Sequence, residues 1–111
     1  MIALTKDKRF EVENTVVFSI IIDPVEEWRK AIQEMPELNQ AIVLFDIDKS
    51  VSKSFSMLTV PSSMHPGLYP GHSYVIIDKN GVVRYILDDP EMGIRNDFLL
   101  QEIKKINQPT N

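Results

Sequence analysis

The sequence contains no cysteine in its 111 residues. The chain therefore has no disulfide, no thiolate ligand for a metal ion and no cysteine nucleophile of its own. Histidine is also scarce, and the two histidines, His65 and His72, lack the paired spacing that metal ligands usually show. These absences exclude thiol chemistry within the chain, and we expect neither a metal site nor a cofactor.

Basic residues and long apolar runs are few as well. Twelve Lys and Arg against sixteen Asp and Glu give a net charge of −4, and the basic residues are scattered. Nucleic acids and anionic membranes need clustered positive charge, so neither is an expected partner. The longest apolar run, Val16 to Ile22, is too short to span a bilayer, and no signal peptide is visible at Met1. We expect a soluble, cytoplasmic protein.

Length and composition are those of one small globular domain. The chain is 43% hydrophobic and 25% charged, which is ordinary for a domain with a modest core. No internal repeat or low-complexity segment interrupts it. We therefore predict a single domain that spans residues 1–111.

A β-hairpin is the most clearly predicted element. Its arms, Tyr74 to Ile77 and Val82 to Leu87, are rich in β-branched and aromatic residues. Between them, Asn80 tolerates a left-handed conformation and Gly81 accepts a positive φ without steric cost. The first arm is apolar throughout, as in an inner strand, and the second alternates, as in a strand nearer an edge.

Two further apolar runs, Val16 to Ile22 and Ala41 to Ile47, predict strands buried on both faces. Between them, an apolar stripe at helical spacing predicts a helix from Pro24 to Met35, with Asp23 as its cap. A strand-helix-strand unit of this kind predicts a parallel pair with a right-handed crossover.

The remaining segments are predicted with different clarity. In chain order they are residues 2–14, either a helix or a short strand; residues 51–58, a short helix capped by Asp48; residues 59–71, a loop rich in Pro and Gly; and a last helix that starts at or just before Asn96 and is ended by Asn107 and Pro109. Long loops in compact domains often carry function.

Three segments together resemble a redoxin of the peroxiredoxin family, which includes alkyl hydroperoxide reductase and thiol-specific antioxidant. They are Phe18-Ser19-Ile20-Ile21-Ile22-Asp23-Pro24 with the helix after it, Leu44-Phe45-Asp46 with Ser50 to Leu58, and Tyr74-Val75-Ile76-Ile77-Asp78-Lys79-Asn80-Gly81-Val82-Val83-Arg84-Tyr85. The resemblance covers roughly residues 14–106. Its most specific part is the hairpin, which thioredoxin-like oxidoreductases share.

The resemblance implies a thioredoxin-like α/β fold with a four-stranded mixed sheet in the order 2-1-3-4 and flanking helices. The strand at Val16 to Ile22 would lie in the middle, parallel to Ala41 to Ile47 and antiparallel to Tyr74 to Ile77. In that family the reactive cysteine lies upstream of the strand matched by Val16 to Ile22, so the chain is expected to be N-terminally truncated. In an alternative alignment, residues 23–27 occupy the redox-motif region without a thiol.

The resemblance also indicates where a binding site would lie. In the similar families, the loop that enters the hairpin faces the reactive cysteine. In this sequence that loop is Tyr69-Pro70-Gly71-His72-Ser73. We predict a binding site there, with no catalytic and no metal-binding residue.

Three functional hypotheses remain open at this point, and whether the chain is an enzyme is left undecided. The first is a redox-inactive redoxin-like fragment or binding and dimerisation module. The second is a thiol redox enzyme that becomes active when its missing N-terminal part is supplied. The third is a small enzyme that uses His72 and a carboxylate such as Asp46, Asp48 or Asp78.

Self-association follows from the expected layers. The helix from Pro24 to Met35 and the C-terminal helix would cover one face of the sheet, and only residues 51–58 and 2–12 remain for the other. Large apolar patches are rarely left bare on monomers. A homodimer is therefore the expected arrangement, with a further protein partner as another possibility.

Overall fold

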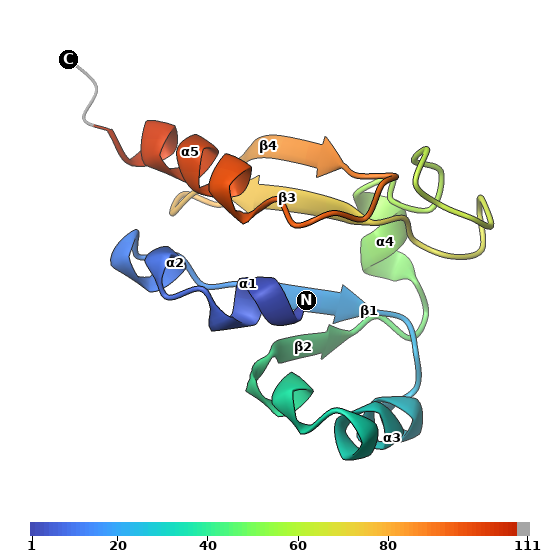
Figure 1. Cartoon of the computed structure of the whole chain (residues 1–111). Helices are drawn as coiled ribbons and strands as arrows, with labels where there is room; N and C mark the ends of the chain where they lie inside the picture. The colour runs from blue at the N-terminus through green and yellow to red at the C-terminus, as the bar shows by residue number, and fades with distance from the viewer. Residues whose placement is uncertain (109–111) are drawn as a thin grey trace.

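The computed structural model describes residues 1–108. Its elements, in chain order, are α1 (Ile2–Lys6), α2 (Arg9–Val12), β1 (Phe18–Ile21), α3 (Val25–Glu34), the 3-10 helix η1 (Pro36–Gln40), β2 (Ile42–Phe45), α4 (Ser50–Ser54), β3 (Ser73–Ile77), β4 (Val83–Asp88) and α5 (Asn96–Asn107) (Figure 1). This composition confirms the α/β class. Pro109, predicted to end the last helix, lies outside the described residues. Within residues 1–108, no helix has the length and apolar character that crossing a membrane requires.

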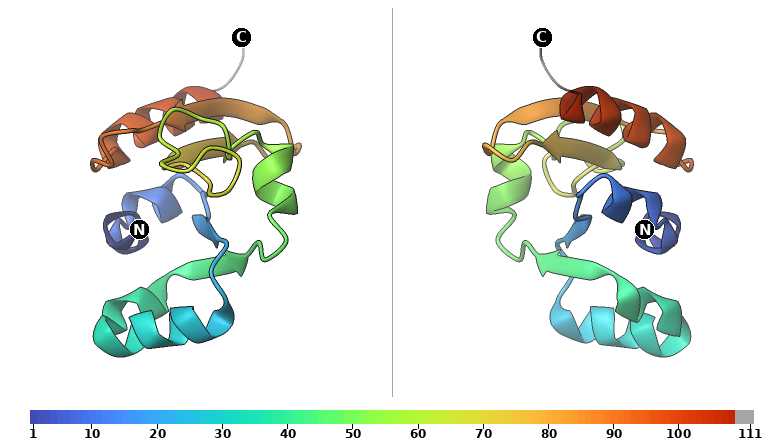
Figure 2. Two further views of the ribbon diagram at one scale, coloured as in Figure 1. Left: turned by 90° about the vertical axis from the view of Figure 1, so that its right-hand side faces the viewer. Right: turned by 90° about the vertical axis from the view of Figure 1, so that its left-hand side faces the viewer.

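The four strands form two separate sheets of two strands each. β1 pairs with β2 in parallel, from Phe18 opposite Ile42 to Ile21 opposite Phe45. β3 pairs with β4 in antiparallel orientation, and the register shifts between Ile76 and Ile77. Figures 1 and 2 show the strands one beside another in the spatial order β2, β1, β3, β4, with β1 and β3 running in opposite directions.

The predicted single sheet is therefore wrong in one respect, because no hydrogen-bonded ladder joins β1 to β3 among the described residues. The parallel pair, the hairpin and the spatial order are as predicted. Side chains, not backbone hydrogen bonds, connect the two halves: Val17 beside β1 and Tyr74 and Ile76 of β3 pack on one apolar cluster. The facing edges of β1 and β3 are left unpaired with each other.

That apolar cluster is formed by helices from the two ends of the chain. Phe10 of α2 packs with Leu99, Leu100 and Ile103 of α5, and each of these side chains is at most 5% exposed. Leu4 of α1 packs against the same cluster. Burial of one such side chain contributes about 1.5–3 kcal/mol, so the cluster is a major source of stability. Figure 2 shows α1, α2 and α5 on one side of the molecule and α4 on the other.

The sheet of β1 and β2 has one poorly covered face. Phe18, Ile20, Ile42 and Leu44 share this face through the parallel register and are 54%, 46%, 50% and 48% exposed. The prediction that both strands are buried on both faces is therefore wrong. The physical reason is a lack of cover, because α4 is shorter than predicted and α1 and α2 pack against α5.

The start of α3 differs from the predicted cap. Pro24 is the N-cap residue and no side chain caps the helix, so Asp23 does not have the capping role predicted for it. Glu26 and Glu27 lie in the first turn, where negative charge is favourable to the helix dipole.

α4 is capped from the end of β2. The buried carboxylate of Asp46 accepts hydrogen bonds from the backbone N–H of Val51 (3.1 Å) and from the N–H and hydroxyl of Ser52 (2.8 and 2.7 Å). Burial raises the pKa of Asp46, but these hydrogen bonds outweigh it and the pKa is lowered. Asp48, the predicted cap, accepts a further bond from the N–H of Ser50 at 3.0 Å.

The hairpin turn forms at the predicted place. Gly81 has a φ of +80°, while Asn80 is not left-handed. The side chain of Asp78 accepts hydrogen bonds from the N–H groups of Asn80 (2.9 Å) and Val82 (3.0 Å) and pairs with Arg84 at 3.2 Å. The turn is thus stabilised by a carboxylate in addition to the glycine.

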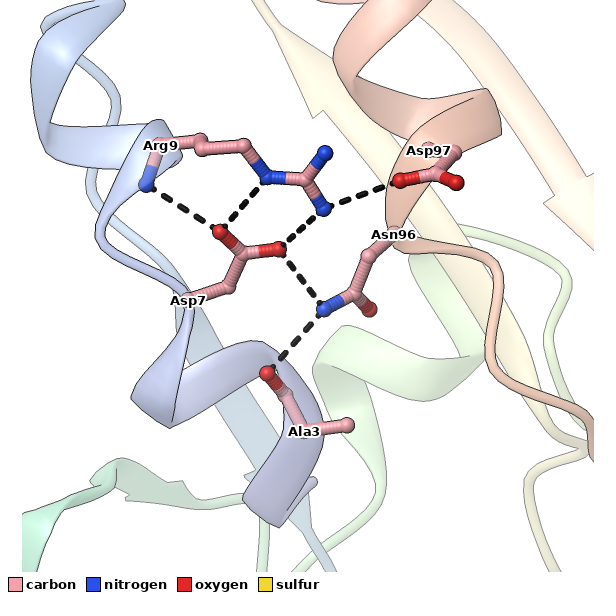
Figure 3. A network of polar contacts seen from close by, with 5 residues as sticks. All are labelled: Ala3, Asp7, Arg9, Asn96 and Asp97. Carbon is pink, nitrogen blue, oxygen red and sulfur yellow. Dashed lines mark hydrogen bonds and ion pairs between the residues drawn. The ribbon is translucent and has the colours of Figure 1, made fainter.

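A polar network fixes α1 and α2 against the start of α5 (Figure 3). The carboxylate of Asp7 accepts hydrogen bonds from Arg9 Nε (2.9 Å) and Nη2 (2.7 Å) and from the Asn96 amide (3.0 Å). Asn96 also donates to the Ala3 carbonyl, and Arg9 pairs with Asp97 at 2.9 Å. The hydrogen bond from Arg9 holds the pKa of Asp7 well below its usual range, although burial opposes this shift.

Replacing Asp7 with Asn tests this network. A carboxylate with a lowered folded-state pKa stabilises the protein above its unfolded pKa of about 4, and this contribution is lost as the pH falls through the folded-state value. We expect Asp7→Asn to be less stable than the natural chain at neutral pH, and the difference in free energy of unfolding to shrink below about pH 4. Urea denaturation across this pH range is the measurement.

Glu11→Gln is the matched control, because it removes only an exposed pair with Lys8. Its pH dependence should follow that of the natural chain. A stability difference for Asp7→Asn that stays constant down to acid pH would contradict the stabilising role of this carboxylate.

Candidate functional site

The predicted binding segment, residues 69–73, carries the chain from the loop after α4 into β3. Three of its residues, Pro70, Gly71 and Ser73, line one end of a cavity. Tyr69 is half exposed and does not line it. Residues 1–108 contain no cis peptide bond, so the bond before Pro70 is trans.

A carboxylate of β4 holds this segment in place. Asp88 accepts hydrogen bonds from the N–H (3.0 Å) and the hydroxyl of Ser62 and from the hydroxyl of Ser73 (2.8 Å). The Ser62 oxygen in turn accepts a bond from the backbone N–H of His72 at 2.6 Å. Burial raises the pKa of Asp88, but the hydroxyl groups of Ser62 and Ser73 outweigh it and keep the pKa low.

The side chain of His72 is not part of an acid-base pair. Its ring packs edge-on against Tyr74, with centroids 5.4 Å apart, and its Nδ1 is buried without a hydrogen-bond partner. The nearby carboxylate of Asp89 is engaged by Arg95, at 2.9 and 3.0 Å, which lowers the pKa of Asp89. Within the described residues, no three His, Asp or Glu side chains converge as metal ligands.

The cavity lies between β1 and β3 and has a volume of about 580 Å³. All five residues of β3, Ser73 to Ile77, line it in succession, and because consecutive residues of a strand point to opposite faces, the free edge of β3 lies on the cavity. The sheet of β1 and β2 lines it differently, through residues 15–17 before β1 and through Phe18, Ile20 and Leu44, which belong to its exposed face. Phe10, Leu99 and Ile103 lie on one side of the cavity.

The lining contains no charged side chain. Its polar side chains are a few hydroxyl groups, and the remainder is aliphatic or aromatic. Ligand pockets are typically about 300–1,000 Å³ and mostly apolar. The arrangement is suited to binding an apolar partner.

Comparisons with known proteins agree with this fold. No protein-family model and no curated protein matches the chain. Among solved structures, the mitochondrial 2-Cys peroxiredoxin from Plasmodium falciparum aligns with a TM-score of 0.74 and 28% identity, over 95% of this chain and 63% of that one. The reduced 2-Cys peroxiredoxin of Plasmodium vivax aligns with a TM-score of 0.71 and 28% identity, over 95% of this chain and 64% of that one.

The chain is peroxiredoxin-like. Its fold is thioredoxin-like, as the resemblance to the redoxins implied. The peroxiredoxin-like chain spans less than two thirds of the length of these two neighbours. It also contains none of the cysteines for which they are named.

Three of the five residues of the predicted loop, Pro70, Gly71 and Ser73, line this cavity, and their role in binding stays a prediction. The sequence did not indicate the larger contribution of β3 and of the residues in and before β1. The apolar runs at β1 and β3 predicted strands that are paired with each other inside one sheet. In the peroxiredoxin-like chain these two strands are not paired with each other, and no feature of the sequence indicated this.

Gly71 supplies a test of the packing at this end of the cavity, which is hereafter called the groove. Its N–H donates to the Met57 carbonyl at 2.9 Å, and a Cβ atom at this position would overlap Ser62 and Val60. We expect Gly71→Ala to destabilise the protein by about 1–3 kcal/mol, as overpacking usually does. Chemical denaturation measures the effect.

Gly93→Ala is the matched control, because its Cβ would meet only the guanidinium of Arg95 at 3.3 Å, and a shift of a few tenths of an ångström would relieve this contact while Arg95 stays paired with Asp89. The control should lie within about 0.5 kcal/mol of the natural chain. Equal stability of the two variants would contradict the close packing at Gly71.

Proposed function

We propose that this chain is a redox-inactive peroxiredoxin-like domain that acts by binding, either to a second copy of itself or to another protein. We infer that residues 1–111 form one domain, and the cytoplasm stays its predicted compartment. The observation that carries the proposal is the combination of a redoxin-like fold with a complete lack of cysteine. The predicted segment 69–73 is part of the proposed binding surface.

The lack of sulfur nucleophiles removes the chemistry of the redoxins. Peroxide reduction and disulfide exchange need a thiolate, which attacks the peroxide oxygen or the disulfide sulfur. Hydroxyl groups such as those of Ser19 and Ser73 cannot replace it, and oxidation of methionine is a slow lesion that does not turn over. A chain of this kind retains the surfaces of the fold but not its reaction.

A second candidate function is supported by the length of the chain. Because it corresponds to 63% of the Plasmodium falciparum neighbour, another chain that supplies the remaining part would complete a thiol redox enzyme. The hypothesis of an enzyme that uses His72 has less support, because its ring makes no hydrogen bond to a carboxylate among the described residues.

The first test of the proposal is chemical inertness. We expect the purified protein neither to consume hydrogen peroxide in the presence of a dithiol nor to reduce a protein disulfide. A cysteine-containing peroxiredoxin assayed in parallel is the positive control. Turnover that survives repurification and metal chelation would contradict the proposal, and its loss in His72→Ala would then support the alternative enzyme.

The exposed face of β1 and β2 supports a homodimer. Phe18, Ile20, Ile42 and Leu44 form a continuous apolar surface across the two strands, and each is about half exposed. An apolar surface of this kind is usually covered by a partner. A two-fold dimer through this face would bury it in both copies at once.

Sedimentation equilibrium over a wide concentration range tests the dimer. We expect a concentration-dependent dimer, and we expect Ile42→Lys to shift the equilibrium to monomer by placing a charge in the interface. Ile86→Lys, at an equally exposed position of β4, is the control and should remain dimeric. A natural chain that is monomeric at every concentration would contradict this interface.

A further inference from the structure

We propose that the groove between β1 and β3 receives an extended segment of another polypeptide, which adds a central strand and joins the two sheets into one. This inference rests on the binding role proposed above and names its partner. The juxtaposition that carries it is that of two unpaired strand edges on either side of one apolar cavity.

Backbone hydrogen-bonding groups are available along both sides of the groove. Each strand of a two-stranded sheet has one paired edge and one free edge that presents N–H and C=O groups. The partners of β1 and β3 are β2 and β4, which lie on the outer sides (Figure 1). The free edges of β1 and β3 therefore face each other, and a strand between them would hydrogen-bond on both sides.

The size and direction of the groove suit a short strand. β1 contains four residues and β3 contains five, so an inserted segment of about five residues, roughly 17 Å long, would match both edges. Since β1 and β3 run in opposite directions, the segment would be parallel to one and antiparallel to the other. The cavity of about 580 Å³ is far larger than a packing defect.

The side chains around the groove define the character of the segment. On one side of the groove lie Phe10, Leu99 and Ile103, and Val51 and Phe55 from the region of α4 also line it. Both sides are apolar and neither carries a charge. The inserted segment should therefore be apolar on both faces, like a central strand, because an unpaired charge would be buried without compensation.

A polypeptide fits this site better than a small apolar molecule. β3 lines the groove along its whole length, and neither β1 nor β3 has a strand partner on the side that faces the other, so a hydrocarbon ligand would leave their hydrogen-bonding groups unsatisfied. The two Plasmodium neighbours support a polypeptide as well, because about a third of each has no counterpart in this chain.

The test uses the full chain and a synthetic peptide with five Val and Ile residues flanked by lysines. Its control has the same side chains and charge but carries N-methyl groups on alternate core residues, which remove N–H donors. We expect saturable binding of the first peptide by isothermal titration calorimetry, and at least tenfold weaker binding of the second. Equal affinity for both would overturn the proposal, as would a lack of binding.

Matched variants locate the site. Ile77 lines the groove and Ile86 does not, and both are 52% exposed. We expect Ile77→Lys to weaken peptide binding at least tenfold and Ile86→Lys to leave it unchanged. If Ile77→Lys does not fold, as judged by thermal unfolding, Val16→Lys at the more exposed end of the groove replaces it.

The same variants distinguish a second copy of this chain as occupant. Three residues of the proposed dimer face, Phe18, Ile20 and Leu44, also line the groove, so dimer and peptide would compete. Ile42 is the one residue of that face outside the lining, and titration of Ile42→Lys therefore measures peptide binding without the dimer proposed above. If Ile77→Lys dissociates the dimer and Ile42→Lys does not, the second copy fills the groove. This result would overturn the proposal that a segment of a different polypeptide occupies it. The peroxide assay does not depend on the peptide. A lack of peptide binding would overturn the groove proposal alone, whereas peroxide turnover would overturn the proposal that the domain is redox-inactive.

Discussion

The apolar contacts between α2 and α5 hold two half-sheets beside each other where no backbone ladder does. Phe10, Leu99, Leu100 and Ile103 form the buried cluster, and residues next to β1 and in β3 pack on it from both sheets. The polar network of Asp7, Arg9 and Asn96 fixes the same helices in place (Figure 3). The position of the two strand edges, and hence the groove, depends on this cluster.

The groove and the lack of cysteine both favour a role in binding over a role in thiol chemistry. The thiol chemistry of the redoxins needs a cysteine thiolate, and this chain has no cysteine. What the fold retains is an exposed apolar face on β1 and β2, and a cavity between β1 and β3 that this face extends into. Such features are typical of proteins that associate, since exposed edges and apolar patches both favour contact with another chain.

Much of the fold could be predicted from sequence because it depends on local chemistry. The turn at Gly81, the helix after Pro24 and the parallel pairing of the first two strands each follow from neighbouring residues. The break between β1 and β3 could not be predicted this way. Apolar runs such as Val16 to Ile22 specify that a strand should be covered, but not which chain supplies the cover.

The candidate site was predicted only in part for a similar reason. Pro and Gly residues predicted a loop at residues 59–71, and the resemblance to the redoxins indicated residues 69–73 as a binding site; three residues of that segment line the cavity. Their positions depend on distant partners, however, since Asp88 anchors the loop through Ser62 and Ser73. Such contacts between residues far apart in sequence have no local signal.

Amide hydrogen exchange followed by NMR on the isolated chain tests the central claim most directly. If β1 and β3 are unpaired edges, the amides of each strand that face its partner should exchange slowly, while those that face the groove should exchange fast. No nuclear Overhauser contacts should link the backbones of β1 and β3. Uniform protection across both strands, with backbone contacts between them, would show a continuous four-stranded sheet and would contradict the existence of an open groove.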